Sequence, residues 1–263
     1  MKNPLFLTII KFLKKKINLK QKKYFFLKHF TNQVYNNKYF YSIINHYECY
    51  LRAVTFEQKE VDTLEWIDGF QPEDILFDIG ANIGVYSLYA SPKINSVIAF
   101  EPHYQNYANL NTNIHLNKFS NIKAYCLAFD STPGLGSFNH YKSNPGSSTS
   151  QLNRNIDQNN KVFEVNQKQE IIIESLSSFI KKSNFFPNHI KIDVDGIELE
   201  ILKGLENYFE DQRLKSILVE VTGDSNQFEE LLKSNGFYLF AKTLTSKKEE
   251  TYNYIFKKSK LLL

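Results

Sequence analysis

Cysteine is scarce in this sequence, which has only Cys49 and Cys126 among its 263 residues. The two lie far apart and fit neither a disulfide framework nor the spacing of metal ligands. We therefore expect no disulfide-stapled secreted domain and no zinc site, and we expect a reducing compartment, the cytoplasm, as the setting. Hydrophobic residues make up 42% of the chain, enough to bury the core of one globular domain with an appendage.

Acidic residues are absent from the first 47 positions, which contain ten lysines. The remainder, residues 48–263, has 22 basic and 28 acidic side chains. A basic arm over residues 1–47 is therefore predicted to precede an acidic domain over residues 48–263. Apolar residues of the arm recur at helical spacing between the lysines, which predicts a basic amphipathic helix. They are Phe6, Ile10, Leu13 and Ile17.

No apolar run approaches the roughly 20 residues that a transmembrane helix needs. The run from Leu5 to Leu13 ends in three lysines instead of the small residues of a signal-peptide cleavage site, so neither a membrane span nor secretion is expected. Two interpretations of the arm stay open: peripheral contact with an anionic membrane through residues 1–30, or a solvated helix or an arm folded on its own acidic domain. Nucleic-acid binding is not expected, because the aromatic side chains of the arm cluster apart from its charges.

From residue 48 onward, short apolar runs alternate with helical patterns. The predicted strands are Ile75–Asp78, Val97–Glu101, Ile122–Ala128, Ile190–Val194 and Ile217–Val221, and the predicted helices are Val85–Ala90, Tyr104–Leu116, Glu198–Leu205 and Phe228–Ser234. Glycine, proline, serine and threonine crowd the stretch between residues 130 and 160, which predicts a long loop. This alternation of strands and helices predicts an α/β fold with a doubly wound, Rossmann-like sheet and helices on both faces. The site is expected at the carboxyl ends of the strands.

The turn F-D-I-G-A-N-I-G-V at residues 77–85 lacks the middle glycine of the dinucleotide fingerprint, and Asn82 stands in its place. A ligand with a nucleoside but no phosphates still needs a tight turn beneath it. S-adenosylmethionine is such a ligand, for which Gly80 and Gly84 leave room. Glu101 ends the next predicted strand 17 residues after Gly84, near the roughly 20 at which a ribose-binding acid follows such a turn. A carboxylate there accepts hydrogen bonds from ribose hydroxyls.

Four blocks, L-F-D-I-G-A-N-I-G-V-Y-S-L, V-I-A-F-E-P, N-P-G-S-S-T-S-Q-L and H-I-K-I-D-V-D-G-I-E-L-E-I-L-K-G, occur in this order. Together they resemble the FkbM-type S-adenosylmethionine-dependent methyltransferases over roughly residues 60–256. The resemblance implies a class I methyltransferase fold and O-methylation of a hydroxyl, often on a sugar or secondary metabolite. It also implies contacts with the methionine end of the cofactor from Asp78, Gly80, Asn82 and Gly84, with the ribose from Glu101 and with the adenine from the strand end near Ala128.

Methyl transfer to a hydroxyl requires that the protein align the acceptor and remove its proton. Three acids at the ends of predicted strands are the candidate bases: Asp193, Asp195 and Glu220. Asp195 with Glu198 three residues later also matches a helix N-cap with its reciprocal acid, so capping and chemistry both stay open for this pair. These carboxylates suit Mg²⁺ or Ca²⁺, but the spacing D-x-D-x-x-E is not that of a calcium loop, and a metal is not favoured.

Residues in and near the predicted loop are candidates for contact with a small-molecule or glycan acceptor. Ser147, Ser148 and Arg154 are similar to the family's Gly-Ser-Ser block, and His140 would contact the acceptor and could act as a base if the loop folds over the site. Two other functions stay open: a non-catalytic nucleotide-binding module docked by its basic arm, and a nicotinamide-dependent oxidoreductase. The absence of the middle glycine of the dinucleotide fingerprint disfavours the oxidoreductase. The sequence does not indicate an oligomeric state.

Overall fold

The computed structural model describes residues 18–30, 33–36, 38–43, 46–141, 144–147, 150–156, 161–247 and 250–259. The amphipathic helix predicted from the apolar spacing between residues 6 and 17 lies outside the described residues, and so does Ser148. The domain that carries the predicted site motifs is otherwise described almost completely.

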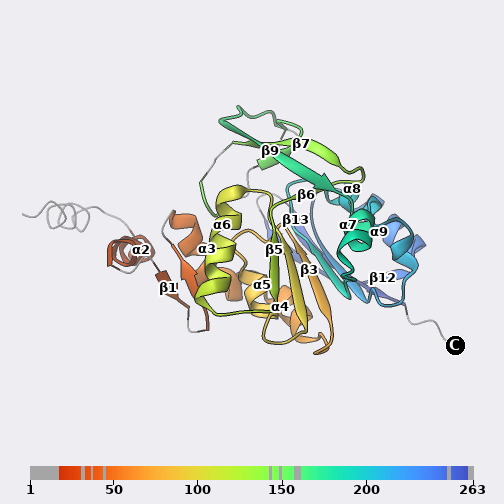
Figure 1. The fold of residues 1–263 in the computed structure, drawn as a ribbon, viewed down its shortest axis with the longest axis horizontal. Helices are drawn as coiled ribbons and strands as arrows, with labels where there is room; N and C mark the ends of the chain where they lie inside the picture. The colour runs from red at the N-terminus through yellow and green to blue at the C-terminus, as the bar shows by residue number, and fades with distance from the viewer. Residues whose placement is uncertain are drawn as a thin grey trace, which may run out of the picture.

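A seven-stranded sheet forms the centre of the domain (Figure 1). Its strands are β3 (Ile75–Ile79), β4 (Ser96–Phe100), β5 (Ile122–Tyr125), β10 (His189–Ile192), β11 (Ser216–Thr222), β12 (Phe237–Ser246) and β13 (Thr251–Lys258). Their order is β12-β13-β11-β10-β3-β4-β5, parallel from β11 to β5, with β13 antiparallel between β11 and β12. Because the chain proceeds outward from β3 on one side and outward from β10 on the other, the strand order reverses between these two strands.

Helices cover both faces of this sheet. One face carries α3 (Tyr47–Lys59), α4 (Val61–Asp68), α5 (Val85–Ala90) and α6 (Tyr104–Leu116), and the other carries α7 (Leu176–Ser183), α8 (Glu198–Lys203), the 3₁₀ helix η1 (Glu206–Glu210) and α9 (Asn226–Ser234). Alternate residues of each strand pack into opposite clusters, so Leu76 joins the first layer and Phe77 the second. The predicted doubly wound α/β fold is confirmed.

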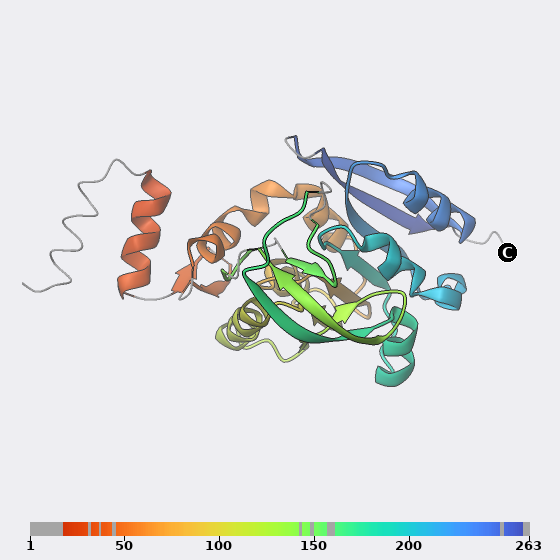
Figure 2. The same cartoon turned by 90° about the horizontal axis from the view of Figure 1, so that it is seen from above.

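A second, four-stranded sheet lies over the carboxyl ends of the central strands (Figure 1, Figure 2). It consists of β6 (Ala128–Phe129), β9 (Gln167–Glu174), β7 (Gly134–His140) and β8 (Ser150–Leu152), in this order. The predictions of one strand over residues 122–128 and of a loop over residues 130–160 were therefore wrong. β7 begins Gly-Leu-Gly-Ser and has little strand propensity, so its pairing with β9 and not its local sequence makes it a strand.

The described part of the basic arm contacts the domain. After α2 (Leu19–Phe30), the strands β1 (Gln33–Tyr35) and β2 (Phe40–Ser42) form an antiparallel hairpin. The backbone N–H of Ser42 donates to Asn113 Oδ1 on α6, and Tyr41 is fully buried. The hairpin thus adds to the first helical layer, while the boundary at residue 47 stays a prediction. Within the described segments, every helix falls short of the length and apolar character that a membrane span requires.

A chain of buried hydrogen bonds ties the amino ends of β10 and β11 to α4. Trp66 Nε1 donates to Ser216 Oγ (2.8 Å), and Ser216 Oγ donates to His189 Nδ1 (2.7 Å). His189 Nε2 then donates to Asp74 Oδ2 (2.9 Å). Burial lowers the pKa of His189, so the neutral ring with its proton on Nε2 satisfies every bond of this chain. The Phe70 ring stacks on the imidazole with centroids 3.6 Å apart.

Replacing His189 with Phe removes the acceptor of the buried Ser216 hydroxyl and one of the two donors to Asp74 Oδ2, which then accepts only from Gln71 N. We expect the free energy of unfolding, measured by urea denaturation, to fall by about 2–4 kcal/mol. His115→Phe on the exposed side of α6 is the control and should change it by less than about 0.5 kcal/mol. The free energy of unfolding of the wild-type protein should also decline as pH falls below 6.5. The pKa of His189 is lowered in the folded state, so the unfolded chain binds a proton more readily there. Equal stability of His189→Phe and wild type would contradict this account.

Candidate functional site

The reversal between β3 and β10 brings two turns together at the carboxyl edge of the sheet. Gly80 follows β3, Asp193 follows β10, and Asp193 N donates to Ile79 O (3.1 Å). Gly80 has φ +80°, and a Cβ there would lie 1.9 Å from the backbone oxygen of Asp193. Glycine alone fits so close an approach. Ligands of doubly wound sheets bind at such a point, in the crevice outside the strand ends.

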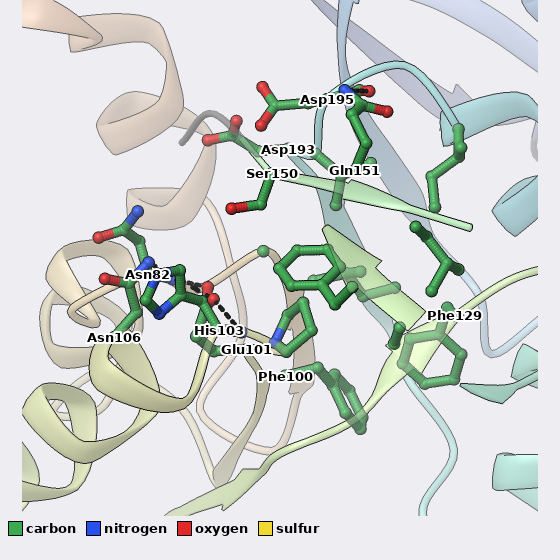
Figure 3. Close-up of a pocket in the computed structure, with 18 of the residues that line it drawn as sticks. Asn82, Phe100, Glu101, His103, Asn106, Phe129, Ser150, Gln151, Asp193 and Asp195 are labelled. Atoms are coloured by element: carbon green, nitrogen blue, oxygen red, sulfur yellow. Dashed lines mark hydrogen bonds between the residues drawn. The ribbon is translucent and has the colours of Figure 1, made fainter. Parts of the chain in front are cut away.

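The first cavity lies at this point (Figure 3). Its polar wall comes from the turn after β3, the end of β4 and the start of α6: Gly80, Asn82, Glu101, His103 and Asn106. Its apolar wall comes mainly from the second sheet: Leu127, Ala128, Phe129, Phe138 and Leu152. The volume of about 80 Å³ is below the range of small-molecule sites. Side chains of these walls must therefore move to admit a nucleoside.

Glu101 is held by backbone groups at both of its carboxylate oxygens. Oε2 accepts from Asn82 N (2.7 Å) and Oε1 accepts from His103 N (2.8 Å). Burial raises the pKa of Glu101 to about 7, although these hydrogen bonds oppose the shift. The carboxylate therefore has a fixed direction and titrates near neutral pH. Figure 3 shows it on the opposite side of the pocket from Asp193 and Asp195.

His103 is a site residue that the sequence predictions missed. Its Nδ1 accepts from Gln105 N at the start of α6, so the neutral ring carries its proton on Nε2. That Nε2 is buried and has no hydrogen-bond partner among the described residues, and burial lowers the pKa of His103 to about 4. A buried donor on a cavity wall is a group that a ligand can satisfy. No motif marks this residue, since histidine is not among the usual N-cap residues.

His140 does not lie in a loop as predicted. It ends β7, is fully buried, and its Nδ1 is 2.8 Å from Ser150 Oγ. The ring centroids of His140 and His103 are 4.4 Å apart, and His140 is on the wall of neither cavity described here. It therefore stands behind His103, in a position set by the pairing of β7 with β9.

Asp193 and Asp195, two residues apart, have pKa values shifted in opposite directions. Its Oδ2 accepts from Lys191 Nζ at 2.6 Å, and the Lys191 side chain is 1% exposed. Burial favours the protonated carboxyl, but the Lys191 charge prevails and holds the pKa of Asp193 at about 2. Burial, then the charges of Glu198 and Asp193, raise the pKa of Asp195 well above its usual value. Of these two carboxyls, therefore, only Asp193 has its ionised form stabilised.

The N-cap considered for Asp195 does not form. The N-cap residue of α8 is Ile197, which has no capping side chain, whereas Glu198 Oε1 accepts from Gly196 N (2.8 Å). Burial raises the pKa of Glu198 to about 7. The backbone oxygen of Asp195 accepts from Gln151 Nε2. Asp195 is left on the wall of the first cavity, free of a capping role.

Asp78 and Gly84 do not line the first cavity. Asp78 is fully buried, and its Oδ2 accepts from Ser87 Oγ on α5. A Cβ on Gly84 would meet Leu110 Cδ1 at 2.4 Å, and the φ of +88° also favours glycine there. Both residues shape the turn behind the cavity wall, so a side chain at residue 84 would collide with α6 and not with ligand space.

Glu220 and Arg154 also stand outside both cavities. Glu220 Oε1 accepts from Thr245 Oγ1 (3.1 Å), and burial raises the pKa of Glu220 to about 9. Arg154 Nη2 donates to Gly196 O and connects the segment after β8 to the turn before α8. The described side chains include no group of three His, Cys, Asp or Glu residues arranged to hold a metal ion.

A second cavity of about 310 Å³ lies between α3, α5 and the segment 144–147. Charged and aromatic side chains line it, among them Arg52, Lys59, Glu60 and Tyr86. Asp193 and Ser147 line both cavities. The two spaces therefore meet at an ionised carboxylate, and Ser147 is the one predicted acceptor contact that the described chain places at this junction.

Comparisons with known proteins connect this region to methyltransferases. A family model described as "Methyltransferase FkbM domain" matches residues 78–252. "Methyltransferase 1" of Beauveria bassiana is 26% identical over 202 residues, which cover 70% of this chain and 81% of that protein. "Hexuronic acid methyltransferase AglP" of Haloferax volcanii is 29% identical over 179 residues, 65% of this chain and 64% of that protein. A solved tRNA m1G37 methyltransferase of M. jannaschii is 12% identical, with a TM-score of 0.49 over 87% of this chain and 56% of that one.

Gly80→Ala should displace Asp193, because the added methyl group overlaps the Asp193 backbone oxygen. We expect the free energy of unfolding, measured by chemical denaturation, to fall by at least about 2 kcal/mol. Gly134→Ala is the matched control, since no atom lies within 4 Å of a Cβ at that position. It should leave stability unchanged or slightly higher. Equal stability of the two variants would refute the close contact between the two turns.

Proposed function

The chain belongs to the FkbM methyltransferase family, and we propose that this methyltransferase transfers the methyl group of S-adenosylmethionine to an oxygen of a small-molecule or glycan acceptor. The observation that supports this most strongly is the junction of the two cavities at Asp193 and Ser147. Transfer between two bound molecules needs a donor space and an acceptor space that meet at one point. We assign the first cavity to the cofactor and the second to the acceptor.

The first cavity suits S-adenosylmethionine by the chemistry of its walls. Glu101 would accept hydrogen bonds from both ribose hydroxyls, and His103 Nε2 would donate to the same nucleoside. The apolar wall around Ala128 would receive the adenine ring, while Gly80 and Asn82 would face the methionine end. When bound, the cofactor supplies a methyl group on a positively charged sulfur, already activated for transfer.

We assign proton removal to Asp193. Glu220 has a pKa raised to about 9 and lies outside both cavities, and Asp195, whose pKa burial also raises, lines only the first cavity. Asp193 lines both cavities and has a lowered pKa. Asp193 would take the hydroxyl proton as the acceptor oxygen receives the methyl group that the bound cofactor would supply, and the electron pair of the broken C–S bond would stay on sulfur. A carboxylate of low pKa is a weak base. It suffices here because the hydroxyl becomes strongly acidic as its oxygen gains the methyl group.

A hydroxyl of a sugar is the acceptor that two observations favour. The Haloferax volcanii relative is named a hexuronic acid methyltransferase, and the polar walls of the second cavity suit hydroxyl groups. Ser147 at the junction is the predicted acceptor contact that we keep. Arg154 and His140 instead hold the second sheet and the turn before α8. No observation favours a nicotinamide-dependent oxidoreductase or a non-catalytic module, and we propose neither.

Asp193→Asn should spare binding of S-adenosylhomocysteine and lower kcat by about 10²–10⁴-fold, the contribution of a positioned base. Calorimetry measures the binding, and formation of S-adenosylhomocysteine with a sugar acceptor measures the turnover. Glu220→Gln, a change outside both cavities, is the matched control and should turn over like the wild type. Because Lys191 loses its partner in Asp193→Asn, the thermal stability of both variants is measured alongside. Full turnover by a folded Asp193→Asn protein would exclude Asp193 as the base.

The basic arm is proposed to contact an anionic membrane from the cytoplasm. On α2, Leu19 and Phe26 are 82% and 59% exposed beside exposed Lys20 and Lys23, a combination that suits such a surface. Removing residues 1–30 should weaken sedimentation with phosphatidylserine vesicles and leave affinity for S-adenosylhomocysteine unchanged, with phosphatidylcholine vesicles as the control. Equal sedimentation of the truncated and full chains would end the membrane proposal.

A further inference from the structure

The second cavity is built largely by a helix outside the matched family region. α3 supplies Glu48, Arg52, Thr55 and Lys59 to its wall, and this helix precedes residues 78–252, which the family model matches. The cofactor assignment uses none of these side chains. The chemistry of the acceptor side therefore depends on the charges that this helix contributes.

Two carboxylates of this cavity already have cationic partners. Glu60 Oε1 lies 3.2 Å from Lys59 Nζ, and Asp193 Oδ2 lies 2.6 Å from Lys191 Nζ. A third acid on the wall, Glu48, has a side chain that is 37% exposed, while its Oε2 is buried and has no hydrogen-bond partner among the described residues. Glu60 and Asp193 therefore do not require a positive charge on the ligand, and all three acids offer acceptors for hydroxyl groups.

Arg52 is a cation on the wall without such a partner. Its Nε donates to Gly146 O at 2.7 Å, which fixes the direction of the guanidinium, and no ion pair within the described segments involves it. The terminal nitrogens therefore keep donors for a ligand. A guanidinium presents these donors as a planar fork that matches a carboxylate. Lys59, with a side chain 54% exposed, adds a second positive charge to the wall.

We propose that the second cavity binds a sugar acid, with the sugar carboxylate on Arg52 and one ring hydroxyl at Asp193 as the methyl acceptor. This assignment rests on the proposed methyltransferase function. The hydroxyl becomes a methyl ether, its proton passes to Asp193, and the sugar carboxylate stays unmodified. A volume of about 310 Å³ lies at the lower limit of small-molecule sites, so the cavity takes one sugar unit, either free or at the end of a glycan.

Titration of the wild-type protein with D-glucuronate, its methyl glycoside and D-glucose tests the proposal, with and without S-adenosylhomocysteine. We expect one or both glucuronates to bind about tenfold more tightly than glucose, because each adds a charge-assisted hydrogen bond. Tighter binding of the methyl glycoside supports a glycan end as the acceptor, and tighter binding of glucuronate supports the free sugar acid. Equal binding of glucose and both glucuronates, or binding of none, would overturn the proposal.

Variants of the cavity wall identify the carboxylate partner. Arg52→Gln should reduce glucuronate binding to the level of glucose, and Arg52→Lys should restore part of it, since the charge returns without the fork. Lys38→Gln is the matched control, because Lys38 is paired with Glu57 outside both cavities, and it should bind glucuronate like the wild type. If Arg52→Gln does not fold, Thr55→Trp fills the cavity from α3 and should block all three sugars. A glucuronate preference that survives in folded Arg52→Gln, or sugar binding that survives in Thr55→Trp, overturns the assignment.

Measuring the binding of S-adenosylhomocysteine in the same samples distinguishes a failure of the sugar-acid assignment from a failure of the proposed methyltransferase function. Intact cofactor-product binding without a glucuronate preference overturns the sugar-acid assignment alone. The opposite result is also possible: the wild-type protein binds glucuronate but not S-adenosylhomocysteine, and Arg52→Gln loses the glucuronate binding. This result overturns the cofactor assignment of the first cavity and supports the sugar-acid site.

Discussion

The contact between the turns after β3 and β10 is the constraint on which the whole site depends. Because Gly80 has no Cβ, the backbone oxygen of Asp193 can lie at a distance that any side chain would forbid. Gly80 belongs to the cofactor wall, and Asp193 lines both cavities. This single close approach therefore sets where donor and acceptor spaces meet. It is held by two central strands that are buried on both faces of the sheet.

A buried ammonium group then decides which acid is ionised. Lys191 Nζ lies 2.6 Å from Asp193 and 4.8 Å from the centroid of the Tyr86 ring. Burial disfavours its charge, but Asp193 and then Asp78 raise the pKa of Lys191 above its usual value. Asp193 and Asp195 are separated by one residue in the sequence, yet this fixed charge lowers the pKa of the first while burial raises the pKa of the second. Two carboxylates acquire different roles from their environments.

The central strands and their helices were predictable, whereas the second sheet and several site residues were not. β3, α5, β4 and α6 lie within one residue of their predicted bounds, because the strands are apolar on both faces and the helices follow them directly. β7 is rich in glycine and becomes a strand only through pairing with β9. Arg52 and His103 belong to no motif, and their positions depend on contacts with Gly146 and His140, which are distant in the sequence.

The most direct test of the junction between the two cavities is a crystal structure of the protein with S-adenosylhomocysteine bound. We expect the ribose hydroxyls on Glu101, the adenine against the second sheet, and the sulfur at the junction, facing Asp193 and the second cavity. A complex in which the sulfur points away from Asp193, or in which the nucleoside occupies the second cavity, would contradict the assignment of donor and acceptor spaces.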